Sequence, residues 1–66
     1  MTKYQLMDAL FNHTSTPNKI RTHDGGLVLG WVQSVQREDG SGGCFNVVVR
    51  IAEENDCRTV FVRTID

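Results

Sequence analysis

The stretch Cys44–Ile51 constrains the fold of this chain more than any other part of the sequence. It is rich in β-branched side chains and has turn-forming residues on both sides, which predicts a β-strand. Alternate side chains of a strand point to opposite faces of the sheet. One face then carries Phe45, Val47, Val49 and Ile51, and the other carries Asn46, Val48, Arg50 and Ala52. Strand candidates precede and follow the stretch, so we expect it to be the central strand of a sheet.

The length of 66 residues predicts a single domain, 1–66, with a small core, because a chain of this size buries only about 60% of its unfolded surface. The formal net charge of −1 argues against a strongly basic nucleic-acid protein. No apolar run reaches the roughly 20 residues that a membrane span needs. Residues 1–8 lack the apolar region of a secretory signal. We therefore expect a cytoplasmic protein with reduced thiols and no membrane partner.

Residues 2–12 are predicted to form a helix of about three turns. Thr2 followed by Gln5 matches the capping box, in which each side chain binds the other residue's backbone N–H. A helix this short is not stable alone in water. We therefore expect its apolar stripe to pack on the sheet. That stripe consists of Tyr4, Leu6, Met7, Leu10 and Phe11.

The remaining pattern predicts strands at about 19–23, 26–37, 44–53 and 57–65, separated by turn-forming residues. The fold class is α+β, with an N-terminal helix packed on a three- to four-stranded antiparallel β-meander. The sequence leaves two forms of the sheet possible, an open meander and a meander curled into a small barrel. In fold type the second form resembles the small SH3-like barrels, and that resemblance implies no function.

Turn lengths set which residues share a face. A five-residue loop at 39–43 would place Val35 opposite Val47 and Trp31 opposite Ile51, and a two-residue turn at 55–56 would place Val49 opposite Val62. Shifting either turn by one residue would exchange the faces of a strand. The face predicted to lie under the helix carries Leu27, Leu29, Trp31, Val35, Phe45, Val47, Val49, Ile51, Val60 and Val62.

The opposite face of the predicted sheet is the candidate binding surface. It is predicted to carry Val28, Val32, Gln36, Asn46, Val48, Arg50, Phe61 and Arg63. Aromatic residues and arginine are enriched at protein interfaces. We therefore expect a non-enzymatic interaction module that binds a protein partner, either a target that it regulates or inhibits or a second copy of itself. The predicted contact residues are Gln36, Asn46, Val48, Arg50, Phe61 and Arg63, with Trp31 added if the register of its strand is shifted.

Two other interpretations of this face stay open. If the sheet closes into a barrel, Val28, Val48 and Phe61 become ordinary core residues. Alternatively, Phe61 flanked by arginines is typical of sheets that stack the bases of single-stranded nucleic acid. The second interpretation is weaker because acidic residues occupy the predicted loops and no basic cluster is present.

Catalytic, metal and cofactor sites are not predicted. Two histidines and two cysteines are present, but no two of them have the short spacing of zinc ligands. The glycine-rich loop 40–43 precedes a strand, whereas a phosphate-binding loop precedes a helix. Cys44 and Cys57 begin two adjacent antiparallel strands and would lie far apart, so we expect two free thiols. A chain this short also has little material left to enclose an active-site pocket.

Overall fold

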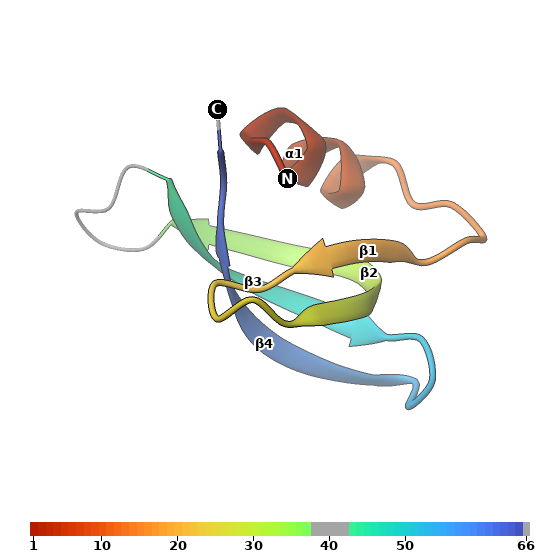
Figure 1. The fold of residues 1–66 in the computed structure, drawn as a ribbon. Coiled ribbons are helices and arrows are strands. Elements are labelled where there is room, and N and C mark those ends of the chain that lie inside the picture. Colours follow the sequence, from red (N-terminus) through yellow and green to blue (C-terminus); the bar gives the residue numbers. More distant parts are fainter. Residues whose placement is uncertain (38–42, 66) are drawn as a thin grey trace.

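The computed structural model describes residues 1–37 and 43–65, so the loop predicted at 39–43 lies outside the described residues except for Gly43. Within this part of the chain, helix α1 (Lys3–Phe11) is followed by β1 (Asn18–Arg21), β2 (Leu27–Arg37), β3 (Cys44–Ile51) and β4 (Asp56–Arg63). The strands form one antiparallel sheet in the order β1-β2-β3-β4, and α1 lies over one side of it (Figure 1). The predicted α+β fold, a helix packed on an antiparallel meander, is therefore confirmed.

The sheet stays open, so the closed barrel is the wrong one of the two predicted forms. Strand β1 pairs only with β2, and β4 pairs only with β3. Among the described residues, the turn after β1 contacts β4, where the backbone N–H of His23 donates to the Phe61 carbonyl oxygen at 2.7 Å. Val48 and Phe61 remain half-buried on the sheet surface, outside the core.

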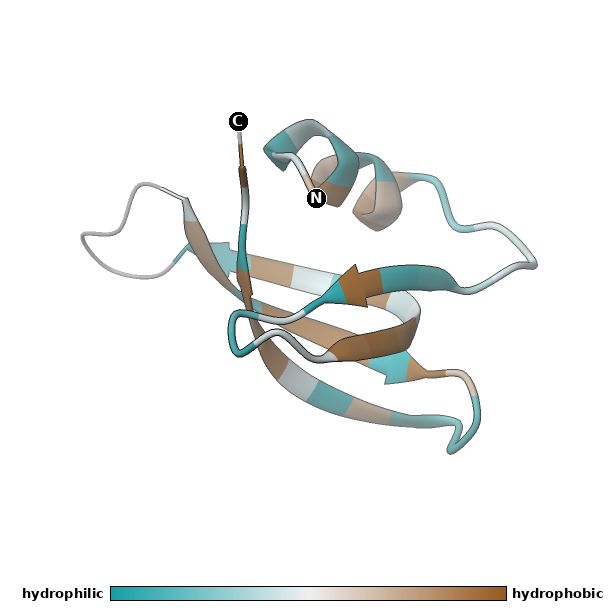
Figure 2. Ribbon diagram, in the orientation of Figure 1, coloured by the Kyte–Doolittle hydropathy of each residue, from teal (hydrophilic) through white to brown (hydrophobic). Residues whose placement is uncertain are grey.

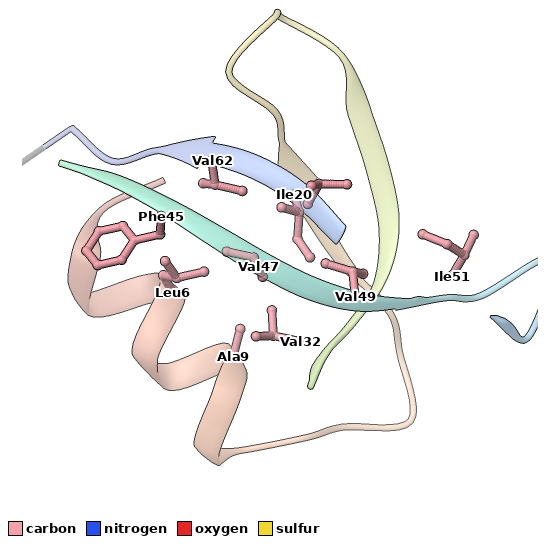
Figure 3. Close-up of a cluster of buried hydrophobic side chains, with 10 residues drawn as sticks. Leu6, Ala9, Ile20, Val32, Phe45, Val47, Val49, Ile51 and Val62 are labelled. Atoms are coloured by element: carbon pink, nitrogen blue, oxygen red, sulfur yellow. The ribbon is translucent and has the colours of Figure 1, made fainter. Parts of the chain in front are cut away.

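The core is built along β3, as the alternation of its side chains predicts. Burial alternates residue by residue along this strand, and hydrophilic and hydrophobic residues also alternate along β1 (Figure 2). Leu6 and Ala9 of α1 point toward the side chains of β3 (Figure 3). The buried apolar residues are Leu6, Ala9, Ile20, Val32, Phe45, Val47, Val49, Ile51, Val60 and Val62.

The first half of β2 has its two faces exchanged relative to the prediction. Trp31 lies opposite Arg50, not Ile51, and the register shifts between Val32 and Ser34. This irregularity places one extra residue, Gln33, in β2, and such a bulge reverses the alternation on one side of it. Val28 and Val32, predicted on the opposite face, therefore pack into or against the core, and Val32 is fully buried. Leu27, Leu29 and Trp31, predicted in the core, lie on the other face.

The predicted register between β3 and β4 is also wrong, but each side chain of β4 lies on its predicted face of the sheet. The connection spans residues 52–55, so Val49 lies opposite Arg58, and Val62 lies opposite Phe45. Asn55 has φ of 52°, a left-handed conformation that asparagine tolerates better than most residues. Relative to the prediction the register moves by an even number of residues, which leaves every side chain on its predicted side.

Helix α1 begins as predicted but buries a narrower surface. The capping box is confirmed, with Gln5 N–H donating to Thr2 Oγ1 at 3.1 Å and Thr2 N–H to Gln5 Oε1 at 2.8 Å. Tyr4 and Phe11 are 82% and 76% exposed, whereas Leu6 is fully buried. At 3.6 residues per turn they lie roughly 150° around the helix from Leu6, too far to reach the same sheet. In residues 1–37 and 43–65, no helix has the length and apolar character needed to cross a bilayer.

Candidate functional site

The face of the sheet turned away from the core, here called the outer face, carries all six predicted contact residues. Their assignment follows from the buried residues with which they alternate along each strand. The bulge adds part of β2 to this surface. The outer face consists of Lys19, Arg21, Leu27, Leu29, Trp31, Ser34, Gln36, Cys44, Asn46, Val48, Arg50, Cys57, Thr59, Phe61 and Arg63.

Three of the predicted contact residues form a direct row across the sheet. Gln36 of β2 lies opposite Asn46 of β3, which lies opposite Phe61 of β4. Val48 lies in the next row, between Ser34 and Thr59. Residues paired in this way have Cβ atoms about 5 Å apart, so these four side chains form one continuous surface.

Arg50 and Trp31 form the most ordered part of the outer face. The guanidinium carbon of Arg50 lies 4.3 Å from the centroid of the Trp31 ring, a geometry that favours a cation–π interaction. Arg50 Nη1 also donates to Asn55 Oδ1 at 3.1 Å, and the indole Nε1 of Trp31 donates to the Thr14 carbonyl oxygen at 2.6 Å. Both side chains are therefore held before any partner arrives, and the guanidinium keeps further N–H donors for a carboxylate.

A second aromatic contact lies at the β4 edge of the outer face. The ring of His23 packs against Phe61 with centroids 4.9 Å apart and an angle of 37° between the planes. The same turn touches β4 through the backbone hydrogen bond from His23 to Phe61. Residues of this turn and of β4 also line a shallow hollow of about 310 Å³. Phe61 is thus fixed from one side and half-exposed on the other.

Asp24 gives this turn a negative charge at neutral pH. Its carboxylate accepts hydrogen bonds from the Thr22 hydroxyl and from the Gly26 N–H. These two bonds, the Thr22 bond foremost, hold the pKa of Asp24 below its ordinary value of 3.8 because both stabilise the ionised form.

The structure brings only one of the two predicted arginines to Phe61. Arg50 lies opposite Cys57, and Arg63 lies opposite Cys44 at the far end of β3. Arg63 lies two positions beyond Phe61 on the same face of β4, roughly 7 Å at about 3.3 Å per residue, whereas the partner of Arg50 lies four positions before Phe61. Phe61 therefore neighbours Asn46, Arg63 and His23, while Arg50 stacks on an aromatic residue of a different strand.

The outer face is positively charged in a chain whose net charge is −1. Its described members include four basic residues and no acidic one, and the basic residues are Lys19, Arg21, Arg50 and Arg63. Arg58 projects to the other side of β4, where it pairs with Glu54 at 3.1 Å. The acidic residues of the turn at 52–55 thus contribute to the rim of the surface and not to its centre.

Sequence reasoning missed the contribution of the first half of β2. Gly30 was the available signal, because a glycine inside a strand often marks a bulge or a close backbone approach. A Cβ atom at this position would collide with the carbonyl oxygen of Arg50 and would lie 2.8 Å from Val49 Cγ1. Trp31, anticipated only for a shifted register, is placed on the outer face by this irregularity.

The histidines and cysteines considered as metal ligands do not lie close together in the described structure. Cys44 and Cys57 are both free, as predicted, and lie at opposite ends of the β3–β4 pair. Within residues 1–37 and 43–65, no three histidine, cysteine or acidic side chains lie close enough together to hold a metal ion.

The fold and this surface define a small helix-plus-meander domain with a basic, partly aromatic sheet face. Comparisons of the chain with protein-family models, with curated proteins and with solved structures found no match.

Proposed function

We propose that this chain is a non-enzymatic interaction module that binds a protein partner through the outer face. The partner is a target that it regulates or inhibits, or a second copy of itself. The interaction takes place in the cytoplasm, where Cys44 and Cys57 stay reduced. The contact surface is the row of Gln36, Asn46 and Phe61 together with Val48, Arg50, Trp31 and Arg63.

The observation that carries this proposal is the Arg50–Trp31 stack. Tryptophan and arginine are the residues most enriched among interface hot spots. Both are already immobilised here, by Asn55 and by the Thr14 carbonyl. A side chain held in its bound geometry loses less conformational entropy on association. The stack therefore supports recognition of a carboxylate-bearing protein surface beside apolar contacts at Val48 and Phe61.

The test is photo-crosslinking from position 48 in cells that express the chain. A photoreactive phenylalanine analogue replaces Val48, and crosslinked products are compared between the otherwise unchanged chain and Arg50→Gln/Phe61→Ser. We expect one dominant product, lost in the double variant, because removing two hot spots weakens binding by roughly 30-fold or more. Sedimentation of the purified chain shows whether that product is a dimer.

Arg58→Gln is the matched control, since it removes an exposed arginine from the other side of β4. It should leave the crosslinked product intact. Circular dichroism should show all variants folded. A product that survives the Arg50→Gln/Phe61→Ser change would contradict the proposal, and so would unfolding of that variant, because the face would then be core.

Binding of single-stranded nucleic acid is the second candidate function. The observation in its favour is the absence of acidic residues among the described members of the outer face. It predicts oligonucleotide binding whose logarithmic affinity falls with log salt by roughly 0.7 per neutralised phosphate. The cover of Arg50 on one face of Trp31 speaks against it, since a base would have to displace that cation to stack there. A 12-nucleotide probe titrated at rising salt decides between the two functions.

A further inference from the structure

A hollow of the described structure lies between α1 and β1, and none of the contact residues proposed above lines it. Its volume is about 650 Å³, within the range of clefts that hold ligands. Helix α1 forms one wall and the edge of β1 the other, and Figure 1 shows these two elements next to each other. The lining residues are Met1, Tyr4, Gln5, Asp8, Ala9, Asn18, Lys19, Arg21 and Leu27.

The strand wall of this groove is an open sheet edge. Thr22 N–H bonds to the Gly26 carbonyl oxygen on the β2 side, and His23 N–H bonds to β4 on the other side. Because backbone groups alternate between the two edges of a strand, the N–H and C=O groups of Lys19 and Arg21 point away from β2. Among the described residues, no backbone group pairs with them on that edge. The groove therefore offers two donors and two acceptors to an added strand.

Side chains that line the groove also have apolar surface and a polar atom that an added strand could cover. Tyr4 and Leu27, which line it, are 82% and 55% exposed. Asn18 Oδ1 is buried in the wall without a hydrogen-bond donor, and a buried polar atom left unpaired is destabilising. An occupant would cover apolar surface and bring backbone donors near this amide.

We propose that an extended acidic peptide segment of a partner protein adds to the edge of β1 in this groove, as a fifth strand. The segment has the pattern acidic–apolar–acidic. Its two carboxylates lie beside Lys19 and Arg21, because residues paired across strands project from the same face. The apolar residue between them projects to the other side, where Ala9 lines the groove.

The charge of the groove favours an acidic peptide over a second copy of this chain as its occupant. Lys19 and Arg21 are both exposed and both line the groove, whereas Asp8 is the one acidic lining residue and already accepts from Asn12 Nδ2 at 2.8 Å. If two copies paired through β1, Lys19 and Arg21 would face the same two cations of the other chain. Like charges directly opposite are unfavourable in a sheet, and lysine on an edge strand is a common protection against such pairing.

The experiment uses a fluorescein-labelled decapeptide with blocked ends and a central Glu-Val-Glu, titrated with the full chain by fluorescence anisotropy. A Lys-Val-Lys peptide is the charge control. We expect the acidic peptide to bind, the basic peptide not to bind, and the affinity to fall with salt. Amide hydrogen exchange should slow at Lys19 and Arg21 on binding, which only strand addition produces.

Two substitutions at one position separate backbone pairing from charge. Lys19→Gln and Lys19→Pro both remove the cation, but only proline removes the outward N–H, and proline is tolerated at such an edge position. The glutamine variant should bind roughly two- to five-fold more weakly than the unchanged chain. The proline variant should bind at least roughly ten-fold more weakly, with an unchanged circular dichroism spectrum.

Each alternative outcome overturns this proposal. Equal affinities of the two Lys19 variants would leave only charge attraction, and no binding of the Glu-Val-Glu peptide would remove the acidic strand. A concentration-dependent dimer abolished by Lys19→Pro would place a second copy in the groove. Arg50→Gln should leave peptide binding unchanged, so failure of the outer-face function and failure of the groove are distinguishable.

Discussion

Gly30 shows how one residue constrains the surface of this sheet. It is buried opposite Ile51, and the space that its side chain would need is filled by the backbone of β3. The close approach leaves the neighbouring Trp31 and Arg50 on the outer face, directly opposite each other. The geometry of the candidate site therefore rests on a residue that has no side chain.

Gly30→Ala should destabilise the chain by about 1–3 kcal/mol, because the added methyl group would collide with the Arg50 carbonyl and the strands would have to separate. Urea unfolding measures the change. Ser34→Ala, an exposed change on the same strand, should stay within about 0.5 kcal/mol. Equal stability of the two variants would show that the strands separate there at no cost.

Asp24 predicts a local pH dependence. Its pKa is lowered in the folded chain, so its contribution to stability is complete above the unfolded value and is lost as pH falls through the folded value. A carboxyl ¹³C titration should give a midpoint below 3.8, and Thr22→Val should move it back toward 3.8 because the largest cause of the shift is removed. Thr16→Val serves as control. An unchanged midpoint in Thr22→Val would contradict the assignment.

At the scale of elements, the helix is held by a narrow contact. Leu6 of the predicted stripe reaches the core, together with Ala9, which was not part of that stripe. The other predicted stripe residues are half-buried or exposed. Periodicity shows which residues share a side of a helix, but the width of the buried strip depends on what the helix meets. Here the buried strip is narrow, and Tyr4 and Phe11 lie outside it.

Two side-chain truncations on α1 should therefore differ greatly in their effect on the free energy of unfolding. Leu6→Ala should cost about 2–5 kcal/mol, because it empties a fully buried site. Phe11→Ala removes a larger side chain but should cost less than about 0.5 kcal/mol, since that ring is mostly exposed. Denaturant unfolding with equal slopes compares them. Similar losses in both would mean that Phe11 is covered in solution.

For the whole molecule, the open sheet keeps its two thiols apart and the outer face available. Dithionitrobenzoate should titrate two thiols in the folded chain, with the exposed Cys57 reacting before the half-buried Cys44. Added reductant should leave the melting temperature unchanged, because no bridge is present to break. Fewer than two reactive thiols in the unfolded, unreduced chain would reveal a disulfide.

Local pattern was sufficient for the elements and for most of the faces. The capping box placed the start of α1, and alternation placed Phe45, Val47 and Val49 inside and Asn46, Val48 and Arg50 outside. An even error in the β3–β4 register did no harm to this assignment. The bulge in β2 made the face assignment wrong for the first half of that strand, because one extra residue changes the side of every residue before it. The position of a bulge depends on how the two strands pair.

The sequence by itself determined a helix, a central strand with one apolar side, and a meander, because spacing and turn residues act over a few neighbours. Only the tertiary structure decided that Arg50 stacks on Trp31, that the sheet stays open, and that the edge of β1 borders a groove. These features depend on the distance in space between segments that are far apart in the sequence. The pattern of neighbouring residues does not encode that distance.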